Sequence, residues 1–263
     1  MGYQEIVVET HGRVGVLRLN LPARLNAMTS DMVDEMDAAL DELTARCRAV
    51  VLTGAGRAFC SGAALDGGLG VPGASRAERD VGRILQSHFN PLMSKLRDLP
   101  VPWITAVRGA AAGIGASFAL AGDLVVASDT AYFLQAFARI GLVSDGGATH
   151  LLVRTIGRVR AMELMLLADR LPAAKALEWG LINRVVPDAV LDEEALKLAA
   201  TLADGPSVAL GLMRRAAWSA LDAPWHEVLR HEREMQTIAG RSSDFDEGIA
   251  AFNEKRAAKF TGT

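Results

Sequence analysis

Two glycine-rich segments carry the clearest chemical signal in this sequence. Residues 53–63 and 107–116 each follow a run of apolar residues that predicts a strand, and the second segment opens a predicted helix. Small residues let a ligand approach the backbone, and a helix N-terminus offers unpaired amide groups and a partial positive charge. This combination suits an anion, including one that forms only in a transition state.

Two other interpretations of the second segment are open at this point. Close packing of a helix on a sheet also requires Gly and Ala, and the pattern alone fits that role equally well. A dinucleotide-binding loop fits poorly, because Gly113-Ile114-Gly115 is followed by Phe118 where such a loop has its third glycine.

Alternating strand and helix patterns surround these segments and predict an α/β fold. A helix begins at a Thr29 or Ser30 cap, and Pro91 is expected to bend the helix over residues 81–96. Residues 62–82 are rich in Gly, Pro, Ser and charge, which predicts a surface loop. The predicted strands are 4–9, 14–20, 49–53, 102–107, 124–127 and 181–186, and further helices are 112–121, 147–152, 158–168 and 173–179.

After Pro187 the strand patterns stop and four helices are predicted, over residues 191–203, 207–221, 225–238 and 245–260. We therefore expect a core domain at residues 1–190 and a helical region at 191–263. The apolar positions of that region need a surface to pack against, and another subunit is one candidate.

The bulk composition narrows the class of protein. The chain has 263 residues and a net charge of −3, so no broad basic surface indicates nucleic acid or an anionic membrane. The apolar stretch 110–126 is interrupted by three glycines and Asp123, which argues against a membrane helix. Without a signal peptide pattern, Cys47 and Cys60 are expected to be free thiols in a cytoplasmic protein. The five histidines show no metal-ligand spacing, so we expect no metal.

Six segments in order along the chain resemble the enoyl-CoA hydratase/isomerase (crotonase) superfamily. The resemblance covers nearly the whole chain, and each segment alone would be weak evidence. The segments are Leu19-Asn20 through Asn26-Ala27, Gly54-x-Gly…Ala58-Phe59-Cys60-Ser61-Gly62-Ala63, Ala106-Val107-x-Gly109…Gly113-x-Gly115, Ile140-Gly141-Leu142-Val143…Gly147-x-Thr149, Ala176-x-x-Trp179-Gly180-Leu181-Ile182 and Phe252-x-Glu254-Lys255-Arg256…Phe260.

The resemblance implies a spiral of repeated β-β-α units, as in the ClpP-like crotonase fold, with C-terminal helices that form trimers or dimers of trimers. It also implies an acyl-CoA substrate whose thioester oxygen is bound by the amides of Ala63 and Ile114. Position 114 is usually Gly in the family, but a backbone donor does not depend on its side chain. Coenzyme A would enter as part of the substrate, and no permanently bound cofactor is implied.

The same resemblance implies which residues contact the substrate. Lys255 and Phe252 would meet the phosphates and adenine of coenzyme A from a neighbouring subunit, and Arg24 would pair with a phosphate. Ala64, Leu65 and Phe137 are also expected to contact the substrate. His88 is a candidate for another reason, because it lies on the apolar stripe of its predicted helix and so could face the acyl pocket. A solvated helix face for Lys255 and a satisfied core position for His88 are the structural alternatives.

The acidic residues at the positions that are catalytic in the family indicate the type of reaction. Family hydratases use two glutamates, and the matching positions here are Ser117 and Phe137. Asp145 lies four residues after Gly141, where isomerase-like members and an aromatic-acid dehalogenase carry an acid. The surrounding residues most resemble isomerases that act on epoxyphenylacetyl-CoA and on 3-enoyl-CoA.

We therefore expect an enoyl-CoA isomerase in which Asp145 moves a proton between two carbons of an enolate. Burial in an apolar pocket would raise its pKa toward the working range. The structural alternative for Asp145 is a cap for the helix that follows. The functional alternatives are an enoyl-CoA hydratase, a hydrolase or dehalogenase with Asp145 as nucleophile, and a non-catalytic CoA-thioester binder.

Overall fold

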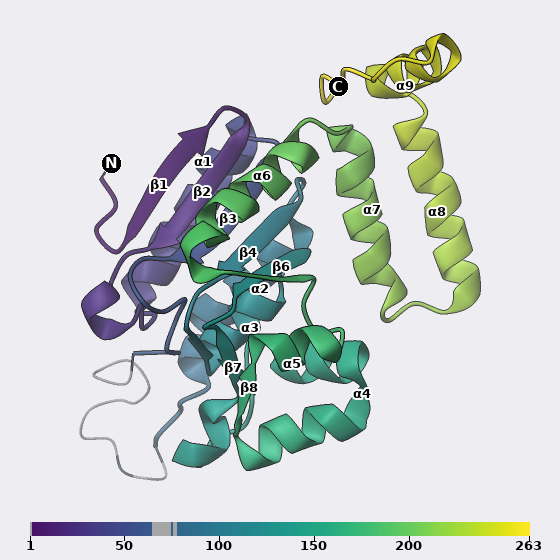
Figure 1. Cartoon of the computed structure of the whole chain (residues 1–263). Helices are drawn as coiled ribbons and strands as arrows, with labels where there is room; N and C mark the ends of the chain where they lie inside the picture. The colour runs from purple at the N-terminus through teal and green to yellow at the C-terminus, as the bar shows by residue number, and fades with distance from the viewer. Residues whose placement is uncertain (1, 65–74, 76–77) are drawn as a thin grey trace.

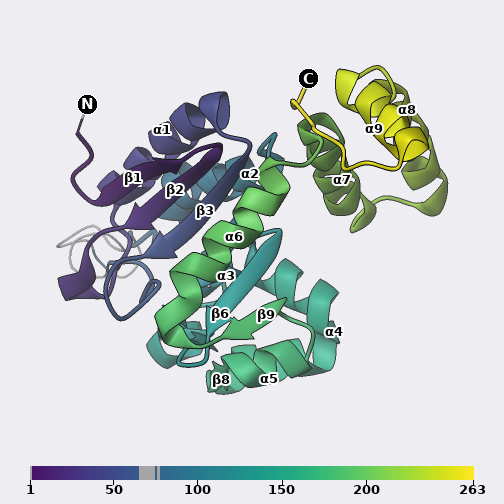
Figure 2. The same ribbon diagram turned by 45° about the horizontal axis from the view of Figure 1, so that its top comes forward.

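The computed structural model describes residues 2–64, 75 and 78–263, and Figure 1 shows the whole chain. A layered α/β core occupies the chain as far as Ala203, and three helices extend from it toward the C-terminus (Figures 1 and 2). Leu65 and most of the loop predicted at 62–82 lie outside the described residues.

A six-stranded sheet forms the centre of the core, in the order β1-β2-β3-β4-β6-β9. Its first pair is antiparallel and every other pair is parallel. Strands β3 and β4 are buried along their whole length, as expected for parallel strands covered on both faces. The strands are β1 (Ile6–His11), β2 (Val14–Leu19), β3 (Ala49–Gly54), β4 (Trp103–Val107), β6 (Leu124–Ser128) and β9 (Arg184–Val186).

A second sheet of three short strands lies next to the first. Strands β5 (Ala110–Ala112), β7 (Tyr132–Leu134) and β8 (Arg170–Pro172) pair in the order β5-β7-β8. The helix was predicted over residues 112–121, but residue 112 ends β5, and α3 (Ile114–Leu120) begins only after Gly113. The sequence did not predict this sheet, because strands of three residues are too short to show an alternating pattern.

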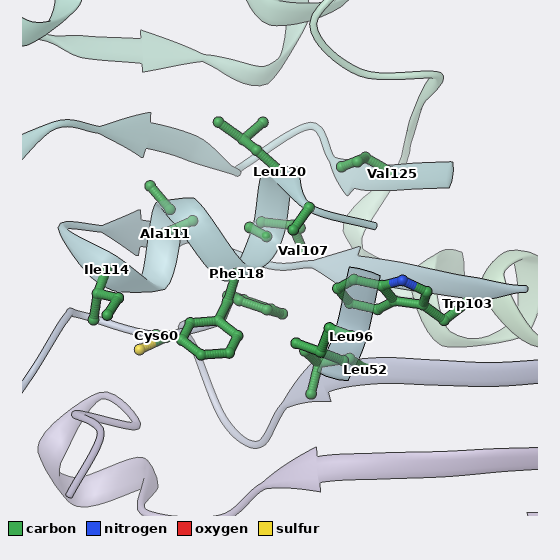
Figure 3. Packing of buried hydrophobic residues seen from close by; sticks show 14 of the residues in the cluster. Leu52, Cys60, Leu96, Trp103, Val107, Ala111, Ile114, Phe118, Leu120 and Val125 are labelled. Atoms are coloured by element: carbon green, nitrogen blue, oxygen red, sulfur yellow. The ribbon is translucent and has the colours of Figure 1, made fainter. Parts of the chain in front are cut away.

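Helices α1 (Ser30–Arg46) and α2 (Asn90–Asp98) pack against the main sheet and bury their apolar residues in the same cluster as those of β2, β3 and β4. The Thr29 side chain accepts a hydrogen bond of 2.9 Å from the Met32 amide, so Thr29 is the predicted cap of α1. Figure 3 shows Leu96 of α2 near Leu52 and Trp103, and Ile114 and Phe118 of α3 near Cys60, all within one apolar cluster. A π-helical turn, η2 (Leu85–Phe89), precedes Pro91 and accommodates its missing N–H.

One long helix stands where two helices were predicted. Helix α4 (Ala148–Leu167) is interrupted at Gly157, whose φ of +77° and ψ of 159° are not helical. The predicted gap between residues 152 and 158 therefore coincides with a kink. The remaining short elements are η1 (Pro22–Arg24), η3 (Ala136–Ile140), α5 (Ala173–Glu178) and η4 (Asp188–Val190).

The C-terminal helices divide into two groups. Helix α6 (Leu191–Ala203), although it follows the division predicted at residue 190, buries Leu191, Ala195 and Ala199 against the main sheet. Helices α7 (Ser207–Ala220), α8 (Trp225–Ala239) and α9 (Ser243–Glu254) extend away from the sheet (Figure 1). The last helix was predicted to reach residue 260 but ends at Glu254, because Lys255 adopts a left-handed conformation with φ +55°.

A buried ion pair ties α7 to the core. Arg214 of α7 is 7% exposed and bonds the Asp123 carboxylate and the carbonyl oxygens of Leu99 and Leu96. Asp123 in turn accepts a hydrogen bond of 2.9 Å from the Trp103 amide at the start of β4. Among the described residues, no helix is long and apolar enough to cross a membrane.

Candidate oxyanion and acid-base site

The two glycine-rich segments meet because their parent strands are parallel neighbours. Thr53 of β3 lies opposite Ala106 of β4, so both strands end at the same edge of the sheet. Beyond that edge the first segment continues along β5, with Cys60 donating to Ala110 at 3.0 Å and Ala112 donating to Cys60 at 2.9 Å. The first glycine-rich segment is thereby carried to the start of α3.

Gly62 and Gly113 mark the closest approach of the two segments. A Cβ built on Gly113 would lie 3.7 Å from the Gly62 Cα, and one on Gly62 would lie 3.2 Å from the Ala112 carbonyl oxygen. Both glycines have positive φ, +112° and +53° respectively, which favours residues without a side chain. Glycine is therefore required at positions 62 and 113 by the backbone conformation and by the close approach of the two segments.

The residues after these two glycines are the predicted oxyanion donors, Ala63 and Ile114. Neither amide donates a backbone hydrogen bond within the described part of the chain. Ala63 sits in an isolated parallel bridge with Met28, in which Met28 donates to Gly62 and Ala64 donates to Met28, both at 2.8 Å. Ile114 is the first residue of α3, where helical amides have no internal partner. Two unpaired amides thus lie next to the Gly62–Gly113 contact.

Asn26 holds the first segment in shape. Its side chain is fully buried and accepts from the Leu21 amide at 2.9 Å. Its amide nitrogen donates to the carbonyl oxygens of Ala55 and Ala58 at 2.9 and 2.8 Å. Through these bonds the Asn26 side chain ties the segment around η1 to the first glycine-rich segment.

Asp145 lies in the segment between η3 and α4. Its main-chain carbonyl oxygen accepts hydrogen bonds from the Ser117 hydroxyl at 2.9 Å and from the Ala148 amide at 3.0 Å. The next residue, Gly146, packs so tightly on α3 that a Cβ there would lie 3.0 Å from Cγ1 of Ile114. Asp145 is therefore held beside the first turns of α3.

The Asp145 carboxylate has no structural role in the described residues. Its Oδ1 atom is buried without a hydrogen-bond partner, and burial raises the pKa of the carboxyl group to about 6. The cap of α4 is Gly147, and no side chain bonds the first turn of that helix, so Asp145 does not cap it. A carboxylate with this environment can exchange protons near neutral pH.

Phe137 also lies at this site. The residue is 7% exposed and sits in η3, and its Cζ atom would be 4.0 Å from a Cβ on Gly113. The aromatic ring therefore lies beside the N-terminus of α3 and provides apolar surface there. Ser117, the second position where a hydratase would carry an acid, is fully buried and uses its hydroxyl to bond Asp145.

The contacts of His88 lead away from the site, whereas those of Arg24 lead to the first glycine-rich segment. The His88 imidazole contacts the Ser87 hydroxyl at 2.7 Å, and its Nε2 atom is 3.9 Å from the Asp34 carboxylate of α1. Its recorded contacts thus point toward α1 and not toward the segment of Asp145. Arg24 is an exposed residue at the end of η1, and its carbonyl oxygen accepts from the Ser61 hydroxyl at 3.3 Å.

Phe252 and Lys255 lie on or directly after α9, far from α3 in the same chain (Figures 1 and 2). The Phe252 side chain is 82% exposed, which is unusual for so large an apolar group. The structure does not bring these two residues together with Ala63, Ile114 and Asp145 within one subunit.

Two polar side chains near the site were not identified from the sequence. Among the described residues, the buried Nε2 atom of His150 on the first turn of α4 has no hydrogen-bond partner, and neither has the Oε1 atom of Gln135, which lies just before η3 and is 3% exposed. Residues on the same face of a helix are three or four positions apart, and His150 follows Asp145 by five. The spacing therefore did not indicate that the two residues lie close together.

Comparison with known proteins shows the family of this chain. The family model for enoyl-CoA hydratase/isomerase matches residues 9–263. The chain is 43% identical to the 1,2-epoxyphenylacetyl-CoA isomerase of Escherichia coli (strain K12) over 96% of this chain and 97% of that protein. It is 40% identical to the "Probable enoyl-CoA hydratase" of Rhodobacter capsulatus, with both chains fully covered.

The fold is also similar to that of a solved structure. The enoyl-CoA hydratase of Bacillus anthracis superposes with a TM-score of 0.91 at 30% identity, over 99% of this chain and all of that chain. The family model, the relatives and the solved structure all carry the same family description. The chain belongs to the enoyl-CoA hydratase/isomerase family, with the crotonase fold and an acyl-CoA thioester as its class of substrate.

Proposed function

We propose that this protein is an enoyl-CoA isomerase that moves a double bond by way of a thioester enolate, with Asp145 as its single proton shuttle. The observation that carries the proposal is the Asp145 carboxylate, which is partly buried, has an unpartnered Oδ1 atom and has a pKa raised to about 6. The name of the Escherichia coli relative supports an isomerase.

In the proposed mechanism the thioester carbonyl oxygen accepts hydrogen bonds from the amides of Ala63 and Ile114. Asp145 removes a proton from the α-carbon of a 3-enoyl thioester, and the electron pair delocalises onto that oxygen. The protonated Asp145 then returns the proton to the γ-carbon, which leaves the double bond in conjugation with the thioester. Each donor would lower the barrier by about 2.7–4 kcal/mol, as in other oxyanion holes.

Coenzyme A would bind outside this pocket. We place Arg24 at a phosphate, and Phe252 and Lys255 of a neighbouring subunit against the adenine and phosphates. Exposed apolar side chains on α8 and α9, among them Leu229, Ile249 and Phe252, support assembly into trimers or dimers of trimers. Ala64 and Phe137 would line the acyl pocket, and a cytoplasmic location would fit a soluble acyl-CoA substrate.

Hydration is the second candidate, because several relatives are named as hydratases. A hydratase would need a second acid, and Ser117 and Phe137 cannot replace a glutamate. The single carboxylate of Asp145 favours isomerisation.

The test is to give the purified protein a 3-enoyl-CoA and, separately, a 2-enoyl-CoA, and to follow the ultraviolet absorbance of the conjugated thioester. Isomerisation predicts a rise with the first substrate. A fall with the second substrate, with a hydroxyacyl-CoA as product, would establish hydration instead. No change with either substrate would reject both activities for these acyl groups.

A further inference from the structure

The Cys60 thiol is a buried group that the proposed mechanism does not use. It is fully buried in the main apolar cluster, where Figure 3 shows it beside Ile114 and Phe118. The main chain of Cys60 donates to Ala110 at 3.0 Å and accepts from Ala112 at 2.9 Å, both in β5. The backbone that carries the thiol is therefore fixed to the strand that leads into α3.

The sulfur atom contacts the peptide unit that contains the first proposed donor. The Gly62 amide donates to Sγ at 3.4 Å, and the thiol donates to the Gly62 carbonyl oxygen at 3.7 Å. Side chains of Ser, Thr, Asn and Asp form turns of this kind with the backbone two residues on. The Gly62 carbonyl and the Ala63 N–H belong to one planar peptide unit, so a bond to the first orients the second.

A second bond holds the same carbonyl oxygen. The Met28 amide donates to it at 2.8 Å. In a trans peptide the C=O and N–H groups point in opposite directions. The Ala63 N–H is therefore directed away from Cys60 and Met28.

The same side chain touches the first turn of α3. A Cβ built on Gly115 would lie 2.7 Å from the Sγ atom, the Cβ atom and the carbonyl oxygen of Cys60. Gly115 directly follows Ile114, whose amide is the second proposed donor. One side chain thus contacts the Gly62–Ala63 peptide and the residue next to Ile114.

The protonation state of the thiol suits this place. Burial raises the pKa of Cys60 to about 12, so the sulfur keeps its hydrogen at neutral pH. The hydrogen remains available for the Gly62 carbonyl oxygen, and no thiolate charge lies beside the amides that would bind an enolate.

We propose that Cys60 is a positioning residue for the oxyanion hole, whose thiol orients the Ala63 amide and sets its spacing from the Ile114 amide. Cys60 acts through these two donors and does not touch the substrate. The inference rests on the proposed function, because it takes both amides to bind the enolate oxygen. A displaced donor costs more when the oxygen carries charge, so Cys60 should affect an enolate more than a neutral thioester.

The test compares two ligands that cannot isomerise. Butyryl-CoA carries a neutral thioester, whereas acetoacetyl-CoA readily forms an enolate that absorbs in the ultraviolet. Calorimetry with the full chain should show that Cys60→Ala weakens acetoacetyl-CoA about 5- to 30-fold and butyryl-CoA less than about 2-fold. This range lies between the loss of one neutral hydrogen bond and the loss of an oxyanion donor. The ultraviolet band of the bound enolate should weaken in parallel at saturating ligand and fixed pH.

Cys60→Ser is the conservative variant. Its hydroxyl can form the same turn with Gly62, so it should recover part of the enolate affinity that Cys60→Ala loses. If Cys60→Ala does not fold, Cys60→Ser should still show a smaller loss that is specific to the enolate, and its absence would overturn the inference.

The matched control is Cys47→Ala. Cys47 is also a free buried thiol of the same apolar cluster, but it lies at the C-terminal end of α1. This variant should change neither affinity. Equal weakening of both ligands by Cys60→Ala, unchanged affinities, or a wild type that binds acetoacetyl-CoA without an enolate band would overturn the inference.

The outcome for the proposed function is separate. If 3-enoyl-CoA is not isomerised but Cys60→Ala selectively weakens the enolate, the proposed reaction fails and the role of Cys60 stands. If isomerisation is observed and the two ligands respond alike, the reaction stands and the role of Cys60 fails.

Discussion

The hydroxyl of Ser117 donates a hydrogen bond of 2.9 Å to the main-chain carbonyl oxygen of Asp145. This bond connects α3, whose first amide is a proposed oxyanion donor, to the segment that carries the proposed base. Ser117 touches the backbone of Asp145 and not its carboxylate, so it is a positioning residue. This single hydrogen bond therefore helps to fix the position of Asp145 relative to the Ile114 amide at the start of α3.

Removing the Ser117 hydroxyl should slow turnover without weakening substrate binding. A neutral hydrogen bond contributes about 1 kcal/mol, so Ser117→Ala should lower kcat of the proposed isomerase about 5-fold with KM unchanged. Steady-state kinetics with a 3-enoyl-CoA gives both values. Ser87→Ala, which removes an exposed hydroxyl bonded to the Arg83 carbonyl, is the control and should have no effect. A rise in KM with constant kcat would contradict the positioning role.

A side chain at position 146 should displace Asp145. Gly146 has φ +58°, and a Cβ there would lie 2.9 Å from the Ser117 Cβ. Gly141 has a similar φ of +71° but nothing within 4 Å of its Cβ position. Both alanine variants carry the backbone cost of about 1–2 kcal/mol, and Gly146→Ala adds an overpacking cost of about 1–3 kcal/mol.

Chemical denaturation and turnover of the two variants can be measured side by side. Gly146→Ala should be the less stable variant and should lose at least about tenfold in kcat, whereas Gly141→Ala should keep most of its activity. Equal activity of the two variants would show that the contact between Gly146 and Ser117 does not position the base.

The rate should depend on pH through the carboxyl group of Asp145. Burial raises the pKa of this group to about 6, and the proposed base is active only when it is deprotonated. We therefore expect kcat/KM to rise about tenfold per pH unit below pH 6 and to level off above it. Initial rates between pH 4.5 and 8, in buffers of constant ionic strength, define the profile. A profile without an inflection between about pH 5 and 7 would argue against this base.

The same burial should make Asp145 a cost to stability at neutral pH. In the unfolded chain the pKa is near 3.8, so the folded state holds the proton more tightly and loses stability as pH rises from about 4 to 6. Asp145→Asn removes this cost. After a discount for partial solvent exposure, the variant should be about 1–2 kcal/mol more stable than the wild type at pH 8.

Denaturant midpoints at one fixed protein concentration test this difference, since assembly also affects stability. The gain should shrink toward pH 4, where the wild-type carboxyl is protonated in both states. Asp169→Asn, an exposed site, should show neither effect. A variant that is destabilised at pH 8 would mean that the carboxylate has a structural partner.

The parts of the fold that depend on local sequence pattern could be predicted from the sequence. The Thr29 cap, the buried strands β3 and β4 and the break in α4 follow from local rules. The three-residue strands β5, β7 and β8 could not be predicted, because tertiary pairing and not sequence pattern forms them. The end of the last helix at Glu254 was missed because a lysine rarely takes the left-handed conformation that stops it.

The sequence indicated candidate site residues where the residue type itself carries a signal, and gave none where only tertiary placement does. Glycines with positive φ at 62 and 113 mark the approach of two backbones, and that signal is visible in the sequence. His88 and His150 show the opposite case. Helical spacing placed His88 on an apolar stripe, but its imidazole contacts Asp34, whereas His150 lines a groove that forms only when α2, α4 and α7 come together.

The most direct test of the central claim is turnover of a 3-enoyl-CoA by the wild type and by Asp145→Asn at pH 8, with binding of a saturated acyl-CoA measured on both. The amide keeps the size of the side chain but cannot exchange the proton. The account predicts that turnover falls about 100- to 10,000-fold while the acyl-CoA affinity stays the same. Asp145→Asn with wild-type turnover would show that another group moves the proton, and the proposed mechanism would be wrong.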